Sequence, residues 1–377
     1  MSSIKFGHGS ASGARAFSAR NHGSFNYNLL LLARQARSMN QATLAKSVAI
    51  GQGHLSKIEN GLNNPTEELV KRFSKVLAFP ISFFYQPARV YLPASFHQRM
   101  KRSVGERDLD RINAENNIRI LNIYKLLQSV EYKPEFPMPQ FDIDEFNGNT
   151  EKIAELVRRA WLLPRGPIMN LTECIERAGA LIIWCDFGDS AVDGVTLSIH
   201  NIPPCIFINY KQPADRMRFT LAHELGHIVM HQIPSPDMEK EANEFASAFL
   251  MPRSDIQASF RVKITLPYLA SLKPIWRVAM QALLMRAKAL GAVDTYQNSY
   301  LWRQINRQKI KFHEPPELDF PHEMPTVFPK LLKIHLEHLG YSIDELAKIL
   351  HLYPDDFQQL YQFPNRLSGN GHLRIVP

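Results

Sequence analysis

The sequence is poor in the features that mark secreted and membrane-spanning proteins. Its 377 residues include three cysteines, Cys174, Cys185 and Cys205, without a C-x-x-C spacing. An odd and scattered set of thiols argues against a disulfide framework and against a thiolate zinc site. No apolar run approaches the roughly eighteen residues that cross a membrane. We therefore expect a cytoplasmic protein with no membrane partner.

The composition is otherwise that of an ordinary globular protein. Hydrophobic residues make up 45% of the chain and charged residues 21%, which excludes a disordered or fibrous class. The length exceeds what one hydrophobic core usually organises, so two or three domains are expected. A net charge of +8 favours a polyanionic partner without identifying it.

Composition and periodicity divide the chain into five segments. A leader rich in Gly, Ser and Ala precedes helical periodicity that starts at Asn28. A charged segment with one long helical pattern then ends at a Pro-rich stretch, and a new pattern begins near Asn149. The predicted segments are a flexible leader (1–25), an all-helical unit (26–85), a helical linker (86–148), a mixed domain (149–300) and a helical C-terminal region (301–377).

The mixed domain changes its period between residues 180 and 210. The runs ALIIWCDF, GVTLSI and PCIFINY are short, rich in β-branched and aromatic residues, and bounded by Gly, Asp and Pro. Helical patterns resume from Ala214 and again from Asp237 to Leu250. The predicted fold class is therefore multidomain, with an all-α N-terminal unit, an α+β domain built on a small sheet, and a mostly helical C-terminal region.

The strongest chemical signal is the segment RFTLAHELGHIVMH, which contains H-E-x-x-H at His223, Glu224 and His227. Four residues on a helix advance about 6 Å and return to nearly the same face, so both imidazoles can reach one metal ion. Glu224 follows the first histidine directly, where its carboxylate can reach water at the metal rather than the metal itself. Zinc suits a site of nitrogen and oxygen ligands.

A catalytic zinc site needs a third protein ligand. The following helical segment, DMEKEANEFASAFLMP, offers Glu239, Glu241 and Glu244. We favour Glu239 over Glu241, because Glu239 shares a face with residues suited to packing on the first helix, whereas the other two carboxylates are expected to be solvated. His231 lies about 12 Å along the helix from His223, too far to share the metal, and is expected to pack or to hydrogen-bond a ligand.

The N-terminal unit contains two short helical segments around a turn. Gln41 to Val48 predicts a first helix, Ala49 and Ile50 a turn, and Gly51 to Glu59 a second helix. Leu44, Ala45, Leu55 and Ile58 supply an apolar seam between the two helices. The polar face of the second helix, with Gln52, Gly53, Ser56 and Lys57, is then free to enter a major groove.

Residues 150 to 290 resemble the ImmA/IrrE family of metallopeptidases. The resemblance rests on FTLAHELGHIVMH followed by EKEANEFASAFLMP, with WLLPRGPIMNL before the sheet and LKPIWRVAMQALLMRAKALG after the site. It implies Zn²⁺ ligands at His223, His227 and Glu239, with Glu224 as the general base. It also implies a repressor protein as the proteolytic substrate.

The N-terminal unit resembles the Xre/Cro type of helix-turn-helix domain, most specifically in LSKIENG and the Pro65 beyond it. The resemblance implies that Gln52, Gly53 and Lys57 face the bases of double-stranded DNA, with Gln41 and Asn60 near phosphates. Gly53 departs from this role, because it has no side chain with which to read a base. A helical interaction or dimerisation module without DNA affinity is the alternative.

Taken together, the two resemblances imply a DNA-binding regulator with zinc endopeptidase activity. It would cleave a helix-turn-helix repressor, or its own linker, and thereby control stress, DNA-damage or mobile-element genes. The competing hypothesis is a non-proteolytic regulator or antitoxin-like protein whose zinc is structural or sensory. A homodimer is compatible with either hypothesis.

Overall fold

The computed structural model describes residues 24–87, 97–100, 105–188, 192–198, 202–233, 235–311, 313–361 and 373–375. All but the end of the predicted leader lies outside these residues. No helix in the described part of the chain is long and apolar enough to span a membrane.

The N-terminal unit is the predicted small helical domain. Its helices are α1 (Tyr27–Ala36), α2 (Gln41–Ser47), α3 (Gln52–Glu59), α4 (Glu67–Leu77) and the 3₁₀ turn η1 (Ile81–Tyr85). Asn26, Asn40 and Thr66 cap the first, second and fourth helices by accepting a backbone N–H of the first turn. Ala49 adopts a left-handed φ of 54° in the turn that crosses α2 over α3. The two predicted helices and their turn are confirmed to within one residue.

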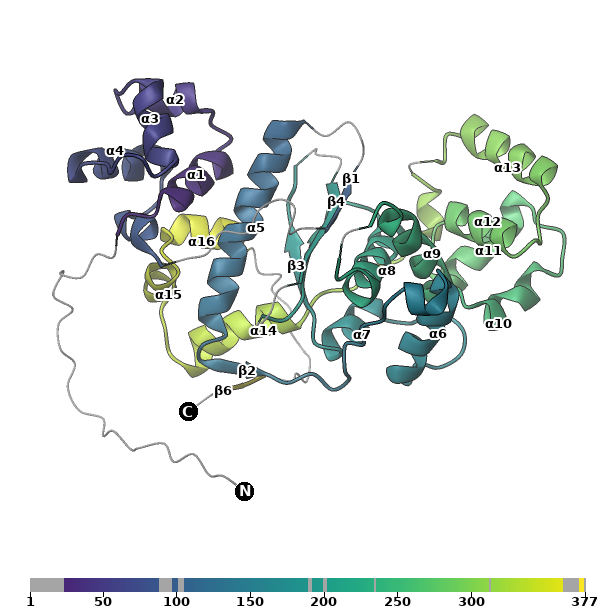
Figure 1. Ribbon diagram of the computed structural model, residues 1–377. Helices are drawn as coiled ribbons and strands as arrows, with labels where there is room; N and C mark the ends of the chain where they lie inside the picture. The colour runs from purple at the N-terminus through teal and green to yellow at the C-terminus, as the bar shows by residue number, and fades with distance from the viewer. Residues whose placement is uncertain are drawn as a thin grey trace.

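A four-stranded sheet lies at the centre of the molecule (Figure 1). Its strand order is β1-β4-β5-β3, with antiparallel pairing of β1 to β4 and β4 to β5 and parallel pairing of β5 to β3. The strands are β1 (His97–Met100), β3 (Leu181–Cys185), β4 (Val192–Leu197) and β5 (Cys205–Asn209). Three of them coincide with the predicted runs, whereas β1 comes from the segment expected to be a helical linker.

The sheet separates two hydrophobic cores, because its side chains alternate between its faces. Leu181, Ile183 and Phe207 face the core that contains α5 (Glu106–Leu126) and α14 (Val327–Lys333). Ile182 and Ile206 face the core that contains α7 (Leu171–Arg177) and α8 (Ala214–Met230). Helices therefore cover both faces of the sheet, as Figure 1 shows.

The remaining helices extend each core. The second core is completed by η3 (Asp144–Phe146), α6 (Thr150–Ala160), α9 (Met238–Leu250), α10 (Arg253–Ile256), η4 (Gln257–Phe260), α11 (Leu266–Trp276), α12 (Met280–Ala289), α13 (Thr295–Arg307) and η5 (Pro316–Leu318). The first core also takes in the N-terminal unit and the C-terminal helices η6 (Ile334–His338), α15 (Ile343–Ile349) and α16 (Pro354–Leu360). A separate ribbon pairs β2 (Val130–Tyr132) with β6 (Leu373–Ile375).

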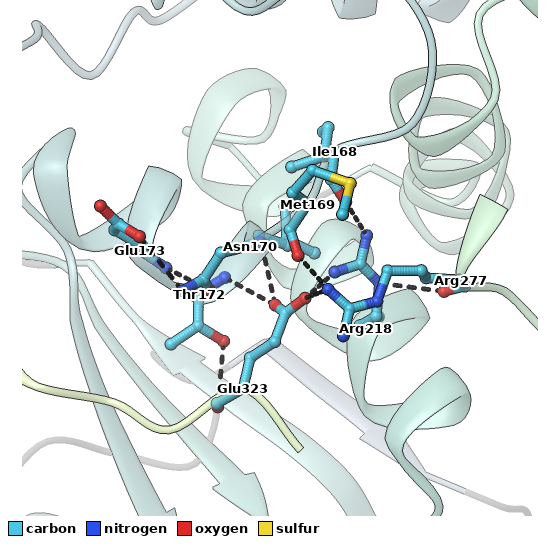
Figure 2. Close-up of polar contacts among 9 residues, drawn as sticks. Ile168, Met169, Asn170, Thr172, Glu173, Arg218, Arg277 and Glu323 are labelled. Atoms are coloured by element: carbon cyan, nitrogen blue, oxygen red, sulfur yellow. Dashed lines mark hydrogen bonds and ion pairs between the residues drawn. The ribbon is translucent and has the colours of Figure 1, made fainter. Parts of the chain in front are cut away.

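The segment that leads back from α13 to α14 is anchored to α7 and α8 (Figure 2). Glu323 accepts the backbone N–H of Leu171 at 2.8 Å and that of Thr172 at 3.0 Å, and it forms an ion pair with the buried Arg218 of α8. Three residues further on, Thr326 donates its backbone N–H to the buried Glu176 at 3.0 Å. We call residues 320–326 the strap. It connects the C-terminal helices to the helix that carries H-E-x-x-H.

The architecture confirms the predicted fold class. The N-terminal unit is all-helical, the domain around the sheet is α+β, and the C-terminal region is helical apart from β6. The predicted boundaries at residues 85, 148 and 300 stay predictions.

Candidate metal centre and nucleic-acid interface

The H-E-x-x-H motif lies in the buried helix α8. His223 and Glu224 are 0% exposed and His227 is 1% exposed. Leu221, Leu225 and other apolar residues of α8 pack in the core beneath the sheet, which fixes the helix around its one polar stripe. Burial at this depth holds both imidazoles in one orientation.

Helix α9 brings a carboxylate to the two imidazoles. Glu239 Oε2 lies 3.4 Å from His223 Nε2, and Glu239 Oε1 lies 3.2 Å from His227 Nε2. The two Nε2 atoms are 3.1 Å apart. One donor atom from each of the three residues lies within 4.8 Å of the others, a cluster that could hold a metal ion. Two nitrogens and one carboxylate oxygen are a donor set that fits a divalent transition metal.

The opposite nitrogen of each ring is engaged by a neighbour. His223 Nδ1 lies 3.2 Å from Asn243 Oδ1, and Asn243 in turn donates to the Glu239 carbonyl at 2.6 Å. His227 Nδ1 lies 2.9 Å from His231 Nδ1. Such contacts fix the tautomer and direct Nε2 at a common point.

Glu241 and His231 extend this network. Glu241 Oε2 lies 2.9 Å from His231 Nε2, and the Glu241 side chain is only 18% exposed. The expectation of a solvated Glu241 is therefore wrong: the buried ring of His231 holds this carboxylate. The expected role of His231 as a hydrogen-bonding neighbour of a ligand agrees with this geometry.

The electrostatics of the cluster follow from burial and pairing. Burial favours the protonated form of Glu239, but its hydrogen bonds and charge interactions with His223 and His227 outweigh this, so the pKa of Glu239 is lowered. Burial and the neighbouring His227 lower the pKa of His231. The pairing thus favours the carboxylate form of Glu239, and burial favours the neutral form of His231 over the opposing effect of Glu241.

Glu224 lies against strand β4. A Cβ atom built on Gly194 would come 3.2 Å from Glu224 Oε1 and 2.7 Å from Thr220 Cγ2. Only glycine lets the strand approach α8 this closely. Sequence reasoning did not single out Gly194, and its position within GVTLSI was the one available signal.

A cleft of about 1100 Å³ opens beside the cluster. Glu239 forms part of its wall, and the Glu239 side chain is 48% exposed while both histidines are enclosed. The walls come from α6, α8, α9, α11, α12 and the segment around Glu314. Lys273 is buried in this wall and pairs with Asp215 and Glu314, each at 2.8 Å. The cluster is therefore open to a molecule on the Glu239 side.

The residues predicted to contact DNA lie on and around α3. Gln52, Gly53, Lys57 and Asn60 are exposed and Ser56 is half-buried. Residues 24–87 hold seven basic and three acidic side chains, so the unit is basic. The surface chemistry thus agrees with a phosphate-rich partner.

Gln41 has a second role that the sequence did not reveal. Its Nε2 donates to Glu59 Oε2 at 2.8 Å, and Glu59 is buried in a two-bond pair with Arg34 at 2.6 and 3.0 Å. The Glu of LSKIENG therefore holds α1, α2 and α3 together. Arg34 lies 25 residues from Glu59, so no local spacing pointed to the pair.

The fold and the site define a helix-turn-helix unit joined to a metallopeptidase-like domain. Comparison with protein families agrees: residues 30–84 match a helix-turn-helix model, and residues 175–288 match the model of the IrrE N-terminal-like domain, a peptidase M78 domain. Both resemblances predicted from the sequence are thus confirmed over these residues. No match was found among curated proteins.

Proposed function

We propose that the protein is a DNA-binding regulator with zinc-dependent endopeptidase activity. The observation that carries the proposal is the convergence of His223, His227 and Glu239 next to the buried Glu224, at the edge of an open cleft. A structural zinc site is closed by four protein ligands, whereas a catalytic site keeps one position open. The exposure of Glu239 favours the catalytic kind.

The chain's own residues divide the work of peptide hydrolysis. His223, His227 and Glu239 would hold the zinc ion, which supplies a Lewis acid that polarises a carbonyl and acidifies water. Glu224 would take a proton from the attacking water and return it to the leaving amine. Asn243 and the pair of His231 and Glu241 hold the imidazoles in orientation.

The proposed substrate is a helix-turn-helix repressor, or a segment of this chain itself. Support comes from the fusion of the two domains and from the resemblance to ImmA/IrrE peptidases. The cleft is larger than most small-molecule sites, which span roughly 300–1,000 Å³, and so has room for a peptide segment. Cleavage would release genes for stress, DNA damage or mobile elements from repression.

Replacement of Glu224 by glutamine tests the proposal. Glu224→Gln keeps shape and hydrogen-bonding reach but accepts no proton, so cleavage should fall by about 10² to 10⁴ while zinc stays bound. The purified protein is incubated with zinc and with the helix-turn-helix proteins encoded near its gene, and fragments are read by mass spectrometry. Glu337→Gln, an exposed acid on η6, is the matched control and should cleave like the parent.

Two outcomes contradict the proposal. Cleavage by Glu224→Gln at the parental rate would remove the catalytic role from this motif. Zinc binding without cleavage of any repressor tried, or of the chain itself, would favour the non-proteolytic regulator with a structural or sensory zinc.

DNA binding has its own test in the full-length chain. Lys57→Ala removes a charge from the exposed face of α3 and should weaken a selected DNA site more than random duplex, by roughly 1–3 kcal/mol for a base contact. Lys71→Ala, an exposed lysine on α4, should change both affinities equally. If Lys57→Ala weakened the selected site and random duplex equally, Lys57 would be a phosphate contact. If the parent bound no DNA at low salt, the helical interaction or dimerisation module would be the better interpretation.

A further inference from the structure

A second cavity lies at the β3 edge of the sheet and shares no lining residue with the cleft beside the metal cluster. Its volume is about 630 Å³, within the range of about 300–1,000 Å³ that is usual for small-molecule sites. Its walls come from α1, the Phe79 loop, α5, β3, the strap, α14 and α16. The cavity thus lies where the N-terminal unit, the sheet and the C-terminal helices meet.

Three guanidiniums and three carboxylates line the cavity, and two of the guanidiniums, those of Arg111 and Arg119, lie beside the same carboxylate, Glu115. Arg111 Nη1 lies 2.9 Å from Glu115 Oε1, and Arg119 Nη1 reaches the other oxygen of the same carboxylate only at 3.5 Å. The remaining acids of the wall have cations of their own: Asp356 pairs with Arg37 and Asp186 with Lys211, each at 2.9 Å. Glu115 thus contacts two guanidiniums, while Arg111 also lies near the charge of Asp186.

Arg119 retains an unused donor: its Nη1 donates to the Asn116 side-chain oxygen at 3.1 Å and lies 3.5 Å from Glu115. It is 4% exposed, and its buried Nε has no hydrogen-bond partner among the described residues. A buried guanidinium that shares its counter-charge and keeps an unused donor is a suitable partner for an incoming anion. Carboxylate, sulfonate and phosphate oxygens match the planar fork of arginine.

The rest of the wall is flat and apolar. Trp184 stacks on Tyr210 with ring centroids 6.0 Å apart and an interplanar angle of 23°. Ile118 and Phe328 contribute further apolar surface. The buried indole Nε1 of Trp184 has no acceptor in the described part of the chain. Such a wall suits a planar ring system that carries a hydrogen-bond acceptor.

We propose that this cavity binds a small amphiphilic anion, a flat apolar body with one acidic group that pairs with Arg119. Ala36, Arg37 and Phe79 of the N-terminal unit line the site, as do Met324 and Pro325 of the strap. These strap residues follow Glu323, which anchors α8 through Arg218 (Figure 2). An occupant would touch both the DNA-binding unit and the segment tied to the metal helix. The proposal stands whether or not the protein is a peptidase.

Two dyes of the same shape test the site in the full-length protein. 8-Anilino-1-naphthalenesulfonate carries a sulfonate, and N-phenyl-1-naphthylamine has the same rings without it. We expect Arg119→Met to weaken the sulfonate dye at least tenfold, as loss of a charge-assisted hydrogen bond predicts, and to change the neutral dye by less than about twofold. Arg303→Met, an exposed arginine on α13, should change neither affinity.

Tryptophan fluorescence shows whether the dye binds beside Trp184. Bound sulfonate dye should quench Trp184, so the quenching should disappear in Trp184→Phe while dye binding persists. Circular dichroism of each variant checks that it is folded, and Arg119→Lys, which keeps the charge but not the fork, should bind with intermediate affinity. Equal loss of both dyes in Arg119→Met, an unchanged affinity for the sulfonate dye, or full quenching in Trp184→Phe would overturn the proposal.

Discussion

At the scale of single residues, the candidate metal centre depends on the H-E-x-x-H spacing, which is visible in the sequence, and on contacts between helices, which are not. His223, Glu224 and His227 fall on one helical stripe, so their proximity could be predicted from a repeat of 3.6 residues per turn. The contact of Glu241 with His231 joins two helices, and no local pattern encodes the distance between them. The choice of Glu239 as third ligand relied on packing logic, and the geometry favours the same residue.

The roles of the two carboxylates can be separated by metal analysis. Glu239→Ala removes a group that lies beside both Nε2 atoms and should sharply lower zinc occupancy. Glu241→Ala leaves the donor cluster intact and frees only the His231 ring, so the protein should still fill with zinc, at an affinity lower by about 10- to 100-fold.

Zinc content after dialysis against a graded chelator distinguishes these outcomes. Glu244→Ala, an exposed neighbour on α9 outside the cluster, serves as control and should match the parent. The reverse order of the first two variants would transfer the ligand role to Glu241.

At the scale of elements, periodicity predicted the helices and the three strands that are rich in β-branched residues. Strand β1 was not predicted, because three of its four residues, HQRM, are polar and neither their hydropathy nor their length indicates a strand. Its place is set by pairing with β4, almost a hundred residues away, and such long-range pairing leaves no local signal. The same holds for β6, which pairs with β2 across more than 240 residues.

The close approach of β4 to α8 gives a prediction at this scale. Gly194→Ala places a methyl group 2.7 Å from Thr220 Cγ2, so strand and helix must separate, at a cost of roughly 1–3 kcal/mol. The displacement also shifts Glu224, and peptide cleavage should fall more than zinc binding does. Thermal unfolding and a cleavage assay on the same preparation measure both effects.

A second substitution shows whether the contact itself is responsible. Thr220→Ser deletes Cγ2 and keeps the hydroxyl that donates to Gln212. In the Gly194→Ala background it should restore most of the stability, whereas activity should stay low because the new methyl group still lies beside Glu224. No recovery of stability would show that the Thr220 contact is not the cause.

At the scale of the whole molecule, the C-terminal helices lie against the N-terminal unit. The strap carries it back from the metallopeptidase-like domain, and α15 and α16 then pack against the N-terminal unit (Figure 1). Asp356 of α16 pairs with Arg37, the residue that follows α1, and Lys125 of α5 donates to Gln86 at 2.6 Å. The sequence predicted helices in the C-terminal region but no contact between the two ends of the chain. An apolar helix face indicates that the helix packs against another element but does not indicate which one. The helix-turn-helix unit consequently shares one hydrophobic core with the sheet.

One contact of this interface makes its stability depend on pH. His351 Nδ1 lies 2.8 Å from the Ser82 hydroxyl of η1, and burial together with the nearby charge of Lys125 lowers the pKa of His351 to about 4. In the unfolded chain the same ring titrates near 6.5, so between these two values the unfolded state binds more protons. The contribution of His351 is therefore fully present above about pH 6.5 and is lost as the pH falls toward 4.

His351→Asn isolates this effect, because the amide can still hydrogen-bond Ser82 but does not titrate. We expect the midpoint of thermal unfolding of the parent, relative to that of the variant, to be constant above pH 7. This midpoint difference should fall by on the order of 2–4 °C between pH 6.5 and 4, since a half-buried titrating group contributes about 1 kcal/mol to the free energy of unfolding after solvent screening. Calorimetry at half-unit pH steps measures this difference in unfolding midpoint. As a control, Ser82→Ala in the parent should leave most of the pH dependence in place, because burial is the main cause of the lowered His351 pKa. A difference between parent and variant that stays flat down to pH 4 would show that the ring of His351 is not held neutral at the junction of the two ends of the chain.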